Sequence, residues 1–262
     1  MGTYSETIGK VTLANGGVIT NGRLTSTAAF DLRDGTVTAG LAGTAGLNKT
    51  TGGTVTLNPQ LNVPYNYTGA TSITGGTLVV NGSISTSAVE ANRVTVGPDA
   101  RLTGAGSIVR PITIGTGGTI APGNPAAGLG TLTTGAQTWE AGSSAAFRIN
   151  NTAADRLAIT GTLAAGASTI MLIDYGLVPA TLTDRSWTLA NTSGGITGFS
   201  NLALDTSALG TFDGQFSLGL AANDTNLLLL YSSVPEPSTC ALLLGLAVLG
   251  AAALVRRRNS AA

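Results

Sequence analysis

Short runs of β-forming residues, each followed by glycine, recur through the first half of the chain. The runs contain Thr, Val, Ile or Leu, and the Gly or Asn-Gly after each run permits the positive φ that a tight corner needs. Successive runs are separated by 19, 18, 23, 16, 18 and 20 residues. This recurrence predicts the stacked rungs of a parallel β-solenoid, in which each rung buries its apolar side chains against its neighbours. The runs lie at Val18, Val37, Val55, Leu78, Val94, Ile112 and Leu132.

We therefore expect an all-β fold, a right-handed parallel β-helix with rungs of about 20 residues. Within a rung, alternation places Leu78 and Val80 inside and Thr77 and Val79 outside. The alternative is a β-sandwich, which also has many short strands and turn signals. Because a sandwich does not require a fixed rung length, the recurrence favours the solenoid.

Part of the chain resembles the autotransporter-associated β-strand repeat found in passenger domains. Residues 67–82, with the sequence YTGATSITGGTLVVNG, carry the resemblance most clearly, and residues 102–108 and 117–124 agree with the family's pattern. The resemblance covers roughly residues 65–135. It implies a parallel β-helix and no particular activity. Residues 58–64 depart from the Gly- and Asn-rich approach usual in the repeat, so we expect a loop there.

The sequence divides into three regions. Residues 1–136 form the predicted repeat solenoid, residues 137–233 a more aromatic, β-rich capping region, and residues 234–262 a tail of different composition. In the capping region, Trp139 and Trp187 are expected to lie in the core or the cap. The alternative is that they form platforms on which sugars stack.

Histidine and cysteine usage restricts the possible chemistry. The chain holds no histidine and one cysteine, Cys240, which lies in the tail. These counts exclude histidine-based triads, an internal disulfide and a conventional zinc site, and we expect no cofactor or metal. Lys plus Arg and Asp plus Glu number 13 each, without a basic stripe, so nucleic acid is not an expected partner.

Catalysis would have to rest on carboxylates or on mixed charges. The acidic candidates each lie beside Gly, Ser or Thr in predicted turns, whereas glycoside hydrolysis needs two acids at a defined separation. A surface ion pair or solubility explains the nearest mixed-charge cluster more simply. We therefore expect no enzyme, and a β-helix polysaccharide lyase or hydrolase is the alternative. The acidic candidates are Asp205, Asp213 and Asp224, and the mixed-charge cluster is Asp99, Arg101 and Arg110.

The tail contains 16 consecutive uncharged residues, 240–255, followed directly by an arginine cluster. This run would form about 24 Å of helix, slightly less than the hydrocarbon core of a bilayer. We predict a transmembrane helix over residues 239–255, with the arginines in the cytoplasm and the body of the chain outside. The alternative is a buried core helix. The cluster consists of Arg256, Arg257 and Arg258.

Immediately before this predicted helix, two prolines favour an extended and accessible segment. The motif Val234, Pro235, Glu236, Pro237, followed by the apolar run and the terminal arginines, resembles the PEP-CTERM sorting signal of Gram-negative bacteria. The resemblance covers residues 234–258, and we assign the whole tail to this signal. It implies that an integral membrane exosortase recognises Pro235, Glu236 and Pro237 and removes the tail.

Together these features predict a non-enzymatic exported surface or extracellular-matrix protein, anchored in the inner membrane as a precursor until exosortase cleaves it. The resemblance implies exosortase and the membrane as partners, with a link to exopolysaccharide or biofilm. An adhesin or a glycan-binding module is the alternative. Members of the family normally begin with a secretory signal peptide, which residues 1–10 lack, so we expect the true start to lie upstream.

Overall fold

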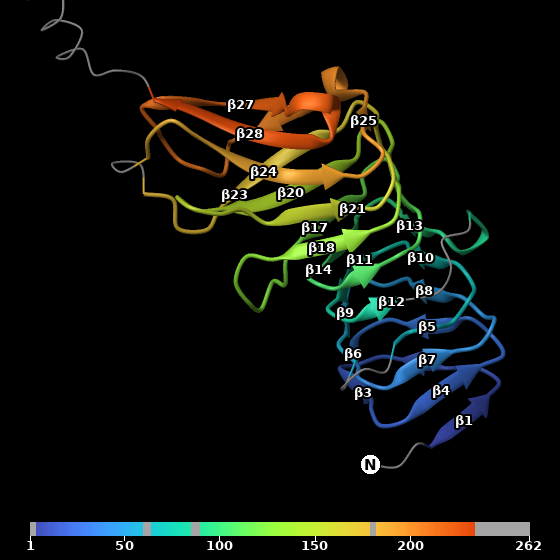
Figure 1. The fold of residues 1–262 in the computed structure, drawn as a ribbon. Coiled ribbons are helices and arrows are strands. Elements are labelled where there is room, and N and C mark those ends of the chain that lie inside the picture. Colours follow the sequence, from blue (N-terminus) through green and yellow to red (C-terminus); the bar gives the residue numbers. More distant parts are fainter. Residues whose placement is uncertain (1–3, 60–63, 85–89, 179–181, 234–262) are drawn as a thin grey trace, which may run out of the picture.

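The chain folds as a stack of short β-strands (Figure 1). The computed structural model describes residues 4–59, 64–84, 90–178 and 182–233. These ranges contain no α-helix, so the all-β class predicted from the sequence is confirmed. Figure 1 shows the strands rising from the N-terminal end to the C-terminal strands at the opposite end. The single-turn 3₁₀ helices are η1 (Glu90–Asn92), η3 (Phe199–Asn201) and η4 (Ala222–Asp224).

Two 9-stranded sheets form two sides of the stack, and all their strands are parallel. The first sheet contains, in spatial order, β2 (Thr12–Leu13), β5 (Phe30–Leu32), β8 (Leu47–Lys49), β10 (Thr71–Ile73), β13 (Val94–Val96), β16 (Ile112–Ile114), β19 (Gln137–Trp139), β22 (Leu163–Ala165) and β25 (Ile196–Thr197). The second sheet contains β3 (Gly17–Ile19), β6 (Gly35–Val37), β9 (Thr54–Leu57), β11 (Gly76–Val80), β14 (Ala100–Gly104), β17 (Thr119–Pro122), β20 (Ser144–Ile149), β23 (Thr169–Asp174) and β26 (Ala203–Asp205).

The third side begins as a 3-stranded sheet and continues as a 7-stranded sheet. Between the two, Tyr65 bridges Ile84 in parallel and the Asn66 N–H donates to Leu41 O at 2.9 Å, so this segment takes the place of a strand. The 3-stranded sheet is β1 (Ser5–Ile8), β4 (Arg23–Ser26) and β7 (Gly40–Ala42). The 7-stranded sheet, hereafter the third sheet, is β12 (Ser83–Ile84), β15 (Ser107–Ile108), β18 (Thr131–Thr134), β21 (Arg156–Ile159), β24 (Arg185–Thr192), β28 (Asn226–Ser233) and β27 (Gly214–Leu220).

The rungs lengthen along the chain. Ser5 pairs with Arg23 and Arg23 with Gly40, so the first rungs advance by 18 and 17 residues. Near the C-terminal end Thr169 pairs with Ala203, an advance of 34 residues. The predicted rung of about 20 residues therefore fits the early rungs and is wrong for the later ones, which carry longer strands and loops.

The runs that were counted as one series in the sequence belong to strands on different sides of the stack. Leu78 lies in the second sheet and pairs with Leu102, whereas Val94 lies in the first sheet and pairs with Thr71. Each side of a rung needs inward apolar residues and a corner after them, so all sides show the same pattern. The parallel pairing is that of a β-helix and does not fit the β-sandwich alternative.

Alternation identifies most of the core. Leu78 and Val80 are buried as predicted, but Val79, expected outside, is only 3% exposed. Val79 belongs to an outward row with Thr103, whose Oγ1 donates to Gly123 O at 3.0 Å. The chain after β17 thus crosses this row and shields it from solvent, which local alternation could not indicate.

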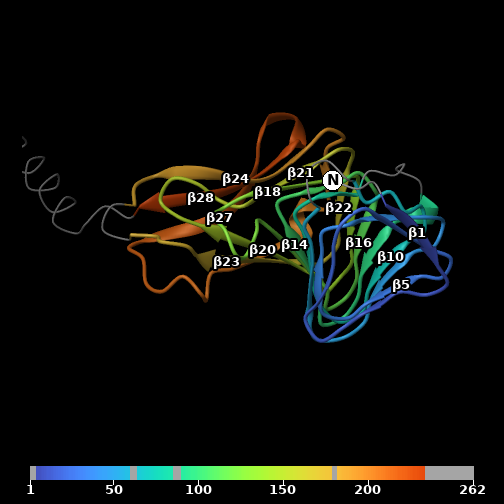
Figure 2. The same ribbon diagram turned by 90° about the horizontal axis from the view of Figure 1, so that it is seen from below.

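Near the C-terminal end, a second lobe extends sideways from the stack of rungs (Figure 2). We call this lobe the wing, and it is formed by β20, β23, β24, β27 and β28. Its interior is a continuation of the core and contains the buried side chains of Phe147, Leu172, Trp187 and Tyr231. The sheets run through residue 136, since β16 pairs with β19 and β17 with β20. The regions distinguished in the sequence on either side of that position therefore share their sheets.

Candidate functional site at the end of the wing

An antiparallel pair of strands closes the wing. β28 pairs antiparallel with both β24 and β27, which reverses the parallel order of the rest of the stack. Four aromatic rings meet there: the Phe212 and Phe216 centroids are 5.4 Å apart at 85°, those of Phe216 and Tyr231 are 4.9 Å apart, and Trp187 lies 6.1 Å from Phe216. The edge-to-face contact between Phe212 and Phe216 adds to the stabilisation from burial.

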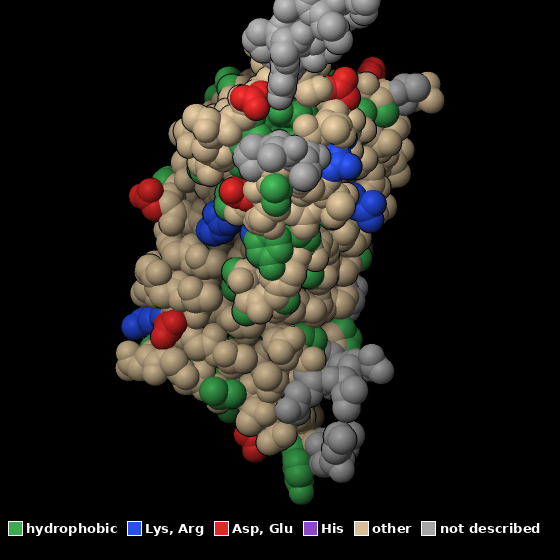
Figure 3. Space-filling model, turned by 90° about the vertical axis from the view of Figure 1, so that its left-hand side faces the viewer, with side chains coloured by type: hydrophobic (Ala, Val, Ile, Leu, Met, Phe, Trp, Pro, Cys, Tyr) green, Lys and Arg blue, Asp and Glu red, His purple; other side chains and the backbone are tan. Residues whose placement is uncertain are grey.

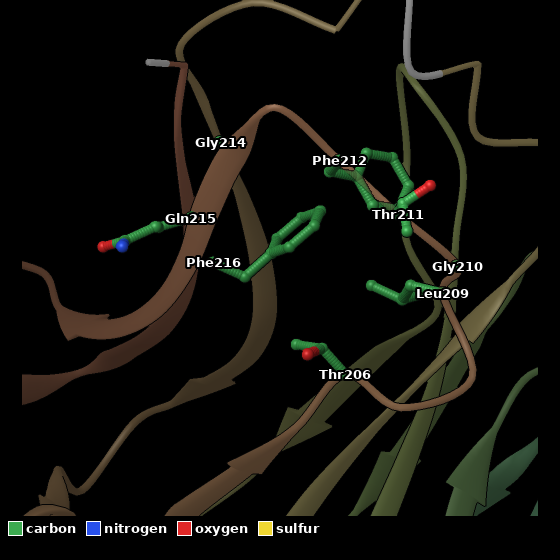
Figure 4. Close-up of a pocket in the computed structure, with 8 residues that line it drawn as sticks. All are labelled: Thr206, Leu209, Gly210, Thr211, Phe212, Gly214, Gln215 and Phe216. Carbon is green, nitrogen blue, oxygen red and sulfur yellow. The ribbon is translucent and has the colours of Figure 1, made fainter.

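A hollow of about 450 Å³ lies between the start of β27 and the loop that precedes it. Figure 4 shows Leu209, Phe212 and Phe216 directed into this hollow and Gln215 directed away from β27 on the other side. The remaining lining includes Thr206 and glycines, and no charged side chain takes part. Such a lining offers apolar contact and neutral hydrogen-bonding groups, but no general acid or base.

The surrounding surface is also weakly charged. Figure 3 shows the face at the wing's end, where Lys, Arg, Asp and Glu side chains are scattered among uncharged ones. One cation near the cluster is Arg185, whose guanidinium carbon lies 5.5 Å from the Trp187 ring centroid. This side chain therefore contacts the aromatic cluster from outside the hollow, where it contributes a cation–π interaction.

The end of β28 is fixed by a carboxylate. Asp184 Oδ1 accepts hydrogen bonds from Ser233 N at 2.7 Å and Ser233 Oγ at 2.6 Å. These hydrogen bonds favour the charged form and hold the pKa of Asp184 below its ordinary value. The last described residue of the chain is thus attached to the body by two bonds.

Acidification is expected to loosen this attachment. A carboxylate whose pKa is lower in the folded than in the unfolded chain stabilises the fold above its unfolded pKa, about 3.9, and loses that contribution as pH falls through the folded value. In the native protein, we expect the hydrogen-exchange protection factor of the Ser233 amide to decrease when the pH is lowered below about 4. In Asp184→Ala it should be low throughout and show no such transition. Equal protection in the two proteins across this range would contradict the assignment.

The acidic candidates do not form a catalytic pair. Asp213 precedes β27 and Asp224 lies in η4 beyond its end, so seven extended residues, about 23 Å at 3.3 Å each, separate them. Glycosidase carboxylates lie about 5–9.5 Å apart. Asp205 accepts the Ser207 N–H at 2.9 Å, which lowers its pKa and gives it the turn role that its sequence context predicted. Among the described residues, no group of three or more acids and thiols could hold a metal.

The mixed-charge cluster is not brought together on the surface either. Arg110 is fully buried, its Nη1 donates to Gly69 O at 2.8 Å, and its guanidinium carbon lies 4.4 Å from the Tyr67 ring centroid. The expected surface role is therefore wrong for Arg110, which stabilises a corner of the preceding rungs. Arg101 lies half-buried on the outward row of β14, and Asp99 is exposed in a turn with φ 54°.

Both tryptophans lie in the core, as the sequence predicted. Trp139 is buried and its Nε1 donates to Gln137 Oε1 at 2.7 Å, while Trp187 is buried with Nε1 donating to Asn150 O at 3.0 Å. Their ring faces are covered, so neither is a sugar platform in this arrangement.

Buried charges were missed in the sequence. Lys49 is fully buried and its Nζ donates to Gly75 O at 2.9 Å and to Thr51 O. Asp155 is fully buried beside Arg148, with Nε to Oδ2 at 2.6 Å. A signal was present: Lys49 and Asp155 occupy the inward positions of alternating segments, two residues from Leu47 and Leu157.

The comparisons with known proteins concern the tail. Residues 233–258 match the PEP-CTERM protein-sorting motif, which begins at the last residue of β28. No curated protein matches the chain. The motif supports an exported precursor that is processed by exosortase, a membrane protein, and that ends up on the cell surface.

The residues predicted to carry sorting lie outside the described ranges. They are Val234, Pro235, Glu236, Pro237, Arg256, Arg257 and Arg258, together with the predicted helix over residues 239–255. Within the described ranges, no helix combines the length and the apolar character needed to cross a membrane.

Proposed function

We propose that the chain is a non-enzymatic exported surface or extracellular-matrix protein, whose β-solenoid is the structural body and whose tail directs exosortase-dependent sorting. The observation that carries this proposal is the junction at Ser233. The body is folded and hydrogen-bonded up to this residue, and the sorting motif starts at the same residue. An enzyme that binds the tail could therefore reach the motif directly after the body, and no strand of the body would have to detach from its sheet.

The same junction suggests how the body is presented. β28 lies at the opposite end of the stack from β1, so the rungs extend away from the sorting motif. We propose that a membrane helix over residues 239–255 holds the precursor with these rungs projecting from the membrane, and that exopolysaccharide is a partner of the released protein. The likeness of the rungs to the autotransporter-associated repeat supports a passive, extended body.

An adhesin or glycan-binding module is the second candidate function. The uncharged hollow beside Phe212 and Phe216 favours it, because neutral sugars are bound by apolar ring contacts and neutral hydrogen-bonding groups. Saturable binding of the intact protein to isolated matrix polysaccharide would support this function. Release of new reducing ends or unsaturated products from the polysaccharide would instead indicate the enzymatic alternative.

Sorting is tested by replacing Pro235, Glu236 and Pro237 together with alanine in the organism that makes the protein. We expect the native protein to end near residues 235–238 and to lack the terminal arginines, as measured by mass spectrometry of protein from envelope and medium. The triple variant should keep its full tail, because the enzyme no longer recognises it. Pro98→Ala, at an exposed turn of the body, is the control and should be processed normally. An intact tail in the native protein from both fractions would overturn the proposal.

A further inference from the structure

β27 is a free edge of the third sheet. Among the described residues it pairs only with β28, although it is seven residues long. Its sequence, GQFSLGL, contains no charged residue and no proline. Natural edge strands usually carry such residues because an open row of backbone N–H and C=O groups pairs readily with another strand. β27 therefore lacks the usual protection against pairing.

The inward row of β27 is incompletely buried. Leu218 and Leu220 are only partly buried, whereas Leu229 and Leu227, their partners on β28, are fully buried. The side chains of β27 are less buried than those of β28 because no further strand among the described residues pairs with β27. A further strand along β27 would cover the remaining apolar surface, and burying apolar area is favourable at about 25 cal/mol per Å².

We propose that β27 pairs antiparallel with β27 of a second copy of this chain, about a two-fold axis at Ser217. A two-fold axis brings the same strand of each copy together, so the contact is self-complementary and closed. With the axis at Ser217, Phe216 of one copy lies opposite Leu218 of the other, and Gly214 lies opposite Leu220. Residues that are opposite each other share a face, so the inward apolar rows of the two copies become continuous.

The hollow at the start of β27 agrees with this register. It is lined by Gly214 together with Phe212 and Phe216, and Gly214 has no side chain to fill it. In this register Leu220 of the second copy lies opposite Gly214, which lines the hollow (Figure 4), so its side chain would face the mouth of the hollow. The two-fold repeats this contact at the other end of the pair.

The charges near the strand permit the arrangement. Asp213 precedes β27 in each copy, and the antiparallel register carries the two Asp213 carboxylates to opposite ends of the paired strands. The two Asp213 carboxylates are thereby not opposed to each other, and each lies opposite Ala221, three residues before Asp224 of the other copy. A parallel pairing of the same strands would place the two carboxylates side by side, where they repel each other.

The test uses the central residue of the strand. Ser217 is exposed on the outward face, so a lysine or a glutamate fits there in a single copy. In the dimer, residue 217 of one copy lies opposite residue 217 of the other, so either substitution places two like charges together. We expect the full chain in a neutral detergent to show a concentration-dependent dimer by light scattering. Ser217→Lys and Ser217→Glu should each raise the dimer dissociation constant about fivefold, because like charges directly opposite in a sheet repel. An equimolar mixture of the two variants should restore dimerisation.

Ser186→Lys is the matched control. Ser186 and Ser217 both pair with Leu230, so they occupy one outward row of the same sheet, but Ser186 lies away from the edge. This variant should dimerise like the native chain. A monomeric native chain, as expected if the tail or a strand of another protein covers β27, overturns the proposal. So does a dimer that is insensitive to Ser217→Lys, one that is weakened equally by Ser186→Lys, or a mixture that does not recover.

Discussion

Replacing Asp155 by alanine is expected to lower the free energy of unfolding by about 3–5 kcal/mol, the usual cost of leaving one partner of a buried ion pair uncompensated. Asp155 is 0% exposed and Arg148 15%, with Nε to Oδ2 at 2.6 Å. Asp155 Oδ1 also accepts the Gly130 N–H at 2.7 Å, and Arg148 Nη2 donates to Gly128 O at 2.9 Å. The variant loses all the bonds of the carboxylate and leaves a shielded guanidinium.

Urea unfolding of the full chain in a mild detergent, followed by circular dichroism, measures this effect. The control is Asp31→Ala, which removes a pair with Arg33 whose side chains are 16% and 47% exposed. Exposed pairs contribute about 0–1 kcal/mol. The double variant Arg148→Met with Asp155→Leu should recover much of the loss, because it removes both charges together. Similar losses in Asp155→Ala and Asp31→Ala would contradict the role assigned to the buried pair.

Substituting Gly104 by alanine is expected to cost about 2–4 kcal/mol, from backbone strain and from overpacking between rungs. Gly104 has φ +131°, in a region that residues with a side chain rarely adopt. A Cβ added there would overlap Val80 O and lie 2.7 Å from Val80 N, both in the backbone of the preceding rung. Backbone atoms held in a sheet cannot move aside as the end of a flexible side chain can.

Gly128 provides the comparison for this variant. A Cβ at Gly128 meets no atom within 4 Å, and its φ is not positive. Gly128→Ala should therefore change the free energy of unfolding by less than about 1 kcal/mol. Both variants are measured by the same unfolding assay. If Gly104→Ala unfolds at the same urea concentration as Gly128→Ala, close rung contact at this glycine is not a constraint on the fold.

The sequence predicts the class of fold well and its dimensions less well. Glycine after short apolar runs is a local property, and it correctly indicates strands joined by corners. The length of a rung is a nonlocal property, set by which runs pair across the stack. Leu78 and Val94 look like successive members of one repeat, yet their partners, Leu102 and Thr71, lie on different sheets.

Buried charges escaped prediction because residue type was given priority over position. Arg110 lies two residues after Ile108 and two residues before Ile112, and both isoleucines are buried in the core. Alternation places Arg110 inside, and the carbonyl of Gly69 and the Tyr67 ring compensate its charge there. Inward position in an alternating segment is thus the better guide in a solenoid, where corners expose carbonyls to the interior.

The site at the end of the wing could not be derived from the sequence. Trp187, Phe212, Phe216 and Tyr231 are widely spaced, and they meet only because β28 reverses direction. The four leucines of β28 form a continuous apolar run, which indicates a buried strand but not its direction. Direction depends on the turn at η4, where Asn223 and Asp224 both have positive φ.

Pairing in the first two sheets joins each strand only to those of the preceding and following rungs. The backbone pairing would therefore allow a complete rung to be added or removed, with the strands on either side pairing in its place. Each such event changes the distance between the N-terminal end and the wing by one strand spacing, about 4.8 Å. The number of rungs therefore sets the distance between the N-terminal end and the wing, and it can change without any change in the wing or in the sorting motif that follows it.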